Sequence, residues 1–130
     1  MKALETWTAV IEAGAGLALL ALPSASTMLL LGTPLESAAA VSIARVGGAG
    51  LLALGTACWL VRSDTESKAS RALVVAMLVY NFLVAAVLAL ASLGSGLQGA
   101  LLWPAVVLHT AMGIWCITRF VAADPADRMT

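Results

Sequence analysis

Four side chains that can carry chemistry lie inside long apolar stretches of this sequence, namely Glu12, Arg45, Asn81 and His109. A charged group at the centre of a membrane helix costs about 2.5 to 3.5 kcal/mol on insertion scales, so polar residues in such places are candidates for function. Histidine titrates near neutral pH, and a carboxylate or an amide can exchange hydrogen bonds with it. A proton relay of Glu12, Asn81 and His109 is therefore one chemistry that these residue types could perform.

Each of these residues also has a structural interpretation. Helical side chains lean toward the N-terminus of their helix, so Glu12 and Arg45 could each extend to water on opposite sides of a membrane. A buried ion pair between Glu12 and Arg45 is the alternative. At 1.5 Å per residue, Asn81 and His109 are both expected about midway through the membrane. We expect His109 to be an interior residue that is hydrogen-bonded to Asn81 or Glu12.

Other residues near this set indicate packing rather than catalysis. Tyr80 is expected to pack with its hydroxyl satisfied, and Cys58 and Cys116 fit no metal spacing and are expected to be small buried thiols. A haem ligated by His109 would need an axial partner, such as a second histidine or a nearby methionine. The sequence has no nucleophile beside a base, no paired carboxylates, no phosphate loop and no metal cluster. We therefore expect no enzymatic activity, no metal and no cofactor.

The composition indicates where these residues lie. Hydrophobic residues make up 62% of the chain and charged residues 11%, whereas a soluble domain carries about a quarter charged residues. There are 23 residues without a charge between Glu12 and Glu36, and 47 between Arg71 and Arg119, and about 20 suffice to cross a bilayer. The formal net charge is zero and there is no basic aromatic patch, so a nucleic-acid partner is not expected. The lipid bilayer is the expected surroundings of a single membrane domain, residues 1–130.

The spacing of prolines, glycines and charges predicts an all-α bundle of four transmembrane helices, over residues 4–22, 37–61, 70–93 and 100–121. Residues 62–71 hold several charges and are predicted to be a polar loop. Pro23 interrupts the first helix, so residues 23–31 are either its kinked end or a short separate helix at the membrane interface, and we favour the separate helix. The second helix should lie at the centre of the bundle, because small residues let membrane helices approach closely. Its packing residues would be Gly47, Gly48, Gly50 and Gly55.

The basic residues predict the orientation. Apart from Arg45, they fall on one side of the predicted membrane, and basic residues are enriched on the cytoplasmic side. Both chain termini should therefore be cytoplasmic, in the inner membrane of a bacterium. The residues concerned are Lys2, Arg62, Lys68, Arg71, Arg119 and Arg128.

Three features of the first half of the chain resemble a known group of proteins. The first helix is broken at Leu22-Pro23-Ser24, a brief apolar segment closes at Gly32, and Ala44-Arg45-Val46-Gly47-Gly48 opens a glycine-rich helix. In these features the sequence is similar to small bacterial DoxX-like membrane proteins and their relatives. The resemblance implies a four-helix inner-membrane bundle, which in some members is an accessory subunit of a membrane oxidoreductase.

Two functions follow from these observations. The first is association, as an accessory subunit of a membrane complex or as a homo-oligomer, because the chain has many small residues and no catalytic set. The second is transport of protons or a small solute, which would use the intramembrane residues Glu12, Asn81 and His109, with Arg45 as a further candidate. The two differ in whether these polar residues face one shared site.

Overall fold

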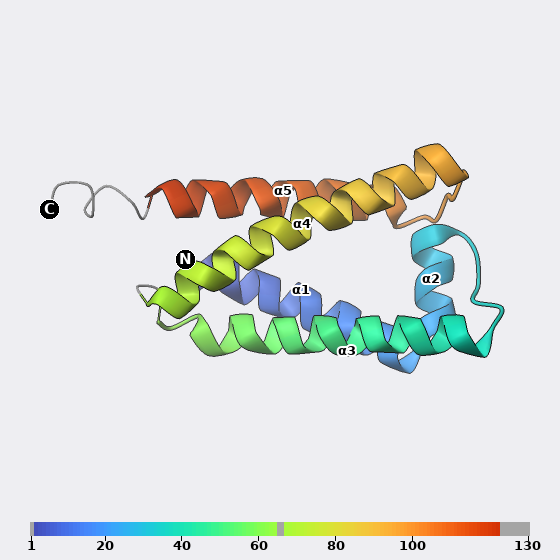
Figure 1. Ribbon diagram of the computed structural model, residues 1–130, viewed down its shortest axis with the longest axis horizontal. Helices are drawn as coiled ribbons and strands as arrows, with labels where there is room; N and C mark the ends of the chain where they lie inside the picture. Colours follow the sequence, from blue (N-terminus) through green and yellow to red (C-terminus); the bar gives the residue numbers. More distant parts are fainter. Residues whose placement is uncertain (1, 65–66, 123–130) are drawn as a thin grey trace, which may run out of the picture.

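The computed structural model describes residues 2–64 and 67–122, which form five α-helices (Figure 1). No strand occurs among these residues. Four of the helices are long and apolar enough to cross a membrane. The predicted all-α fold with four candidate membrane spans is therefore confirmed. The helices are α1 (Lys2–Ala21), α2 (Pro23–Leu31), α3 (Ala38–Val61), α4 (Lys68–Ser95) and α5 (Leu102–Ala122).

Local residues explain where the helices begin and end. The side chains of Ser37 and Ser67 accept hydrogen bonds from the backbone N–H groups of Ala40 and Ser70, each at 3.1 Å, and so cap α3 and α4. Gly32 and Gly96 end α2 and α4 with φ angles of 77° and 69°, which glycine adopts without a steric cost. Arg128 and part of the predicted polar loop, 62–71, lie outside the described residues.

The break at proline gives a separate short helix. Leu22 has φ −131° and ψ 58°, outside the helical region, and Pro23 occupies the first position of α2, where its missing N–H is not needed. In Figure 1, α2 runs across the direction of the four long helices. Of the two interpretations of residues 23–31, the separate helix is thus the one that forms, and a kinked continuation of α1 does not.

The four long helices pack as two pairs. α1 packs mainly against α3, and α4 mainly against α5. In the first pair the backbones touch: a Cβ added to Gly16 would lie 2.7 Å from the carbonyl oxygen of Gly48, and one added to Gly55 would lie 2.8 Å from the N atom of Ala13. Small residues therefore fix the register of α1 on α3, as they commonly do at contacts between membrane helices.

The two pairs meet at one end and separate toward the other (Figure 1). We call the first the N-terminal end, which holds the starts of α1 and α4, and the second the α2 end. An apolar core joins the pairs at the N-terminal end, with side chains from all four long helices. Its buried members are Leu4, Ala9, Cys58, Val74, Met77, Met112 and Cys116.

At the α2 end the connection is made by backbone atoms. The backbone N–H of Leu101 donates a hydrogen bond to the carbonyl oxygen of Leu29 at 2.9 Å. A Cβ added to Gly99 would lie 2.3 Å from the carbonyl group of Leu30, and one added to Gly32 would lie 2.6 Å from the carbonyl oxygen of Gln98. α2 is therefore attached directly to the connection between α4 and α5.

The expectation that the glycine-rich helix lies at the centre was wrong. α3 has three buried residues, Gly48, Gly55 and Cys58, and it lies along one edge of the bundle in Figure 1. An added Cβ at Gly47 or Gly50 would meet no atom within 4 Å. Only one face of a helix can contact a single neighbour, so two of the four glycines pack within this chain and the other two do not.

Candidate functional site

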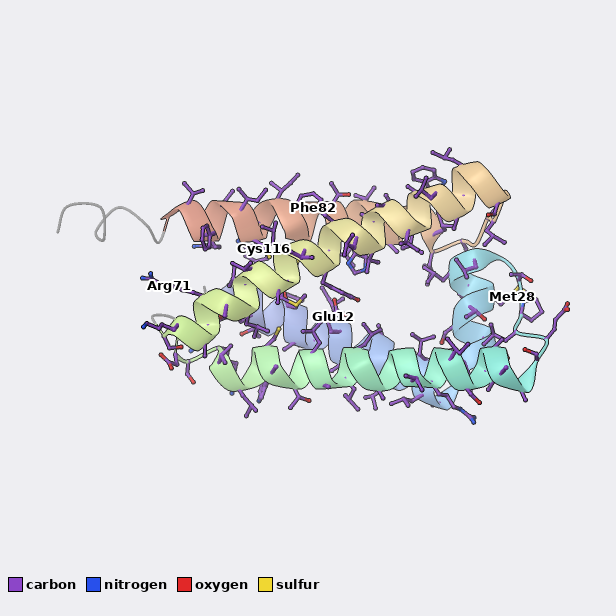
Figure 2. The ribbon with its side chains drawn as sticks, viewed as in Figure 1. Glu12, Met28, Arg71, Phe82 and Cys116 are labelled. Carbon is purple, nitrogen blue, oxygen red and sulfur yellow. The ribbon has the colours of Figure 1, made fainter. Side chains whose placement is uncertain are left out.

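A buried carboxyl group of α1 contacts α4 in the middle of the bundle. Glu12 is 3% exposed, and its Oε2 accepts a hydrogen bond of 2.9 Å from the hydroxyl of Tyr80. Figure 2 shows Glu12 between α1 and α4, where the two helix pairs face each other. The expectation that the Tyr80 hydroxyl is satisfied is confirmed, and the group that satisfies it is this carboxylate.

A histidine of α5 contacts the next residue of α4. The Nδ1 atom of His109 lies 2.8 Å from Oδ1 of Asn81, and Asn81, which is 1% exposed, donates from Nδ2 to the carbonyl oxygen of Met77 at 2.8 Å. The amide oxygen is therefore the acceptor, so Nδ1 of His109 carries the hydrogen. In a neutral imidazole this leaves Nε2 with a lone pair that can accept a proton.

These two hydrogen-bonded pairs form one cluster. The rings of Tyr80 and His109 meet edge to face, with centroids 5.7 Å apart and planes at 80°, which is a favourable arrangement for aromatic rings. Tyr80 and Asn81 are consecutive residues of α4. We call the set the polar cluster, and its members are Glu12 of α1, Tyr80 and Asn81 of α4, and His109 of α5.

The structure brings together three of the four polar residues singled out from the sequence. Glu12, Asn81 and His109 share the polar cluster. His109 was predicted to bond to Asn81 or Glu12, and its partner is Asn81. Arg45 lies elsewhere: its Nε atom donates to the carbonyl oxygen of Leu20 at 3.3 Å, and its side chain is exposed. The alternative of a Glu12–Arg45 ion pair was therefore wrong.

The register of the two helices explains that separation. Gly16 of α1 lies against Gly48 of α3, and the helices run in opposite directions, so Arg45 lies beside the last turn of α1. Glu12 is eight residues before Leu20, which at 1.5 Å per residue is about 12 Å along the helix. An ion pair needs the two charged groups within 4 Å, which this register prevents.

Sequence reasoning missed a second buried carboxylate. Glu5 is 2% exposed and Ser70 is fully buried, and the hydroxyl of Ser70 donates a hydrogen bond to Oε1 of Glu5. A signal was available: Glu5, Thr8 and Glu12 follow the i, i+3, i+7 spacing of one helix face. That stripe indicates that a polar face of α1 turns inward.

The described residues contain no group of three or more His, Cys, Asp or Glu side chains arranged to hold a metal ion. Cys58 and Cys116 are free and buried, as expected. Within this part of the chain, the group of side chains that could carry chemistry is therefore the polar cluster, whose members are joined by hydrogen bonds and include groups that can take up protons.

Comparisons of the chain with protein-family models, with curated proteins and with solved structures found no match. The resemblance to DoxX-like membrane proteins was not tested by them and stays a prediction. A function for this protein is therefore proposed from the geometry of its own residues.

Proposed function

We propose that this protein acts by association within a membrane, binding a second copy of itself or another membrane subunit through α3. The observation that carries the proposal is that α3 is covered on one face by α1 and leaves two glycines uncovered. Gly47 and Gly50 have no atom within 4 Å of an added Cβ. In lipid, where helices are not driven together by hydrophobicity, such small residues allow close backbone contact with another helix.

The uncovered face has the pattern of a helix-packing surface. Seven exposed residues of α3 follow the alternating spacing of three and four that left-handed helix pairs use, and Gly47 and Gly50 lie beside them. Most have small side chains. The residues are Ala39, Ser42, Val46, Ala49, Ala53, Thr56 and Leu60.

The proposal includes a bacterial inner membrane with both chain termini in the cytoplasm. Support for it comes from the basic side chains of the described residues. Lys2, Arg62, Lys68 and Arg71 lie at or beside the N-terminal end, and Arg119 lies in the last turn of α5. An enrichment of Lys and Arg on one side is typical of the cytoplasmic side. A reporter fused to either terminus measures this orientation directly.

Association is tested by measuring the mass of the protein in a mild detergent, with variants on the uncovered face. We expect a dimer or a complex with a copurifying subunit, and we expect Ala49→Leu and Ala53→Leu to weaken it at least about tenfold, which is about 1.4 kcal/mol. Ala86→Leu is the matched control, because Ala86 is an exposed alanine of α4. A wild-type protein that is strictly monomeric and brings no partner through purification contradicts the proposal.

The polar cluster supports a second candidate function, the transfer of protons across or into the membrane. Its carboxylate, phenol, imidazole and amide come from three helices and meet where the two helix pairs face each other. A carboxylate and an imidazole with a free Nε2 are groups that accept and release protons under mild conditions. If the cluster only joined helices, it would not require a titratable group on both α1 and α5.

Proton movement into liposomes that contain the reconstituted protein tests this candidate. We expect Glu12→Gln and His109→Ala to lower the rate of proton uptake at least tenfold. Ser92→Ala is the control, since Ser92 is a buried polar residue outside the polar cluster. Rates that are the same in the wild type and in both cluster variants would exclude this function.

A further inference from the structure

A small pocket at the N-terminal end contains two buried oxygen atoms without a hydrogen-bond partner among the described residues. These are Oε2 of Glu5 and Oγ1 of Thr8. The pocket has a volume of about 10 Å³, close to the roughly 10 to 15 Å³ that one water molecule needs. Buried polar atoms are rarely left without a partner, because their desolvation is costly. The lining residues are Leu4, Glu5, Thr8, Cys58, Leu73, Val74 and Met77.

Thr8 differs from the other threonines of the long helices. Thr6, Thr56, Thr110 and Thr118 each donate their hydroxyl hydrogen to a carbonyl oxygen three or four residues earlier, the usual local bond of a helical threonine. Thr8 makes no such bond. Its hydroxyl is therefore available to a molecule in the pocket.

Two helix N-termini lie beside the Glu5 carboxyl group. Glu5 is in the first turn of α1 and Ser70, its hydrogen-bond donor, is in the first turn of α4, and helix N-termini carry a partial positive charge. The titratable group that faces this pocket from α3 is the Cys58 thiol, and α5 contributes Cys116 to the adjoining core.

We propose that Glu5, Thr8 and Ser70 form a proton-binding site that holds one water molecule. The water donates one hydrogen bond to Oε2 of Glu5 and a second bond joins it to Oγ1 of Thr8, while Ser70 donates to Oε1. On proton uptake, a hydronium ion in the pocket gives up one proton, an O–H bond forms at Oε2 of Glu5, and a neutral water is left behind. The ligand is thus a proton carried by water.

The site lies on the same face of α1 as the polar cluster. Glu5, Thr8 and Glu12 are spaced i, i+3 and i+7, and seven residues of helix span about 10 Å. The proposal stands on the pocket and its two buried oxygen atoms, and does not depend on either proposed function of the protein.

Infrared spectroscopy of the protein in lipid tests the site, because a protonated carboxyl group has a C=O stretching band of its own. We expect a band that titrates with pH, moves in D₂O and disappears in Glu5→Gln but persists in Glu12→Gln. Thr8→Val should move this band, because the water loses one of its two anchors, whereas Thr8→Ser should leave it in place. A spectrum in which Glu5→Gln removes no titrating band would overturn the proposal.

Ser70→Ala provides a second measurement if Glu5→Gln does not fold. It keeps the carboxyl group and removes the hydrogen bond to Oε1, so the same band should shift. A band that is unaltered by both Ser70→Ala and Thr8→Val would show that the carboxyl group lies outside this site, and would also overturn the proposal.

Discussion

The two ends of the molecule hold the helix pairs together in different ways. At the N-terminal end, apolar side chains from four helices interlock, and a serine hydroxyl bonds a buried glutamate. At the α2 end, backbone meets backbone, through Gly32, Gly99 and the hydrogen bond between Leu101 and Leu29. Side chains can change rotamer when a neighbour changes size, but a backbone held in a helix cannot. The α2 end should therefore tolerate substitution less than the N-terminal end does.

The largest effect is expected for Gly99→Ala. An added Cβ would lie 2.3 Å from the carbonyl carbon and oxygen of Leu30, and φ of Gly99 is not positive, so the steric clash alone is measured. We expect the free energy of unfolding to fall by about 3 kcal/mol, the upper part of the range for overpacking. Unfolding in mixed micelles with a rising fraction of dodecyl sulfate measures it.

Gly94→Ala is the control for that experiment. An added Cβ at Gly94 would meet no atom within 4 Å, so no loss of stability is expected, and a gain of up to about 1 kcal/mol fits the higher helix propensity of alanine. Equal losses in the two variants would mean that the backbone contact at the α2 end contributes nothing, and the comparison between the ends would not hold.

At the N-terminal end, Met77→Ala is expected to have the next largest effect. Met77 is 3% exposed and belongs to the apolar core, and truncation of a buried methionine usually costs at least about 2 kcal/mol. Val79→Ala on the same helix is the control, since Val79 is 53% exposed. The same unfolding measurement should separate the two variants. If the control loses as much stability, side-chain packing is not what joins the pairs at this end.

The smallest effect is expected for the pair Glu12 and Tyr80, which lies between the two ends. Hydrogen bonds between membrane helices contribute about 0.6 kcal/mol on average. In a double-mutant cycle of Glu12→Met and Tyr80→Phe, we expect a coupling energy of that size in the free energy of unfolding. Strictly additive losses would show that this hydrogen bond does not help to hold the two helix pairs together. Side chains would then connect the pairs only through the apolar core.

Sequence patterns predicted the helices well, because uninterrupted apolar runs, prolines and glycines act locally. The break at Pro23 and the turn at Gly32 are examples, as is the inward position of Asn81 and His109. Patterns did not predict which glycines pack, because Gly48 and Gly47 differ only in the direction they face, and that direction depends on the register of α1 against α3. The burial of Glu5 was missed for a related reason: a residue in a first turn is usually close to water, and here the start of α4 covers it.

The pairing of α1 with α3 has a consequence for synthesis. Every residue of that contact, from Ala9 and Ala13 to Gly48 and Gly55, precedes Arg62, so the first helix pair can assemble while the ribosome has yet to translate α4. The second pair is translated afterwards as a hairpin, which packs on the first pair through the apolar core. The chain thus has a direction of assembly, set by its order of translation, in which the loop after Val61 separates two stages of insertion.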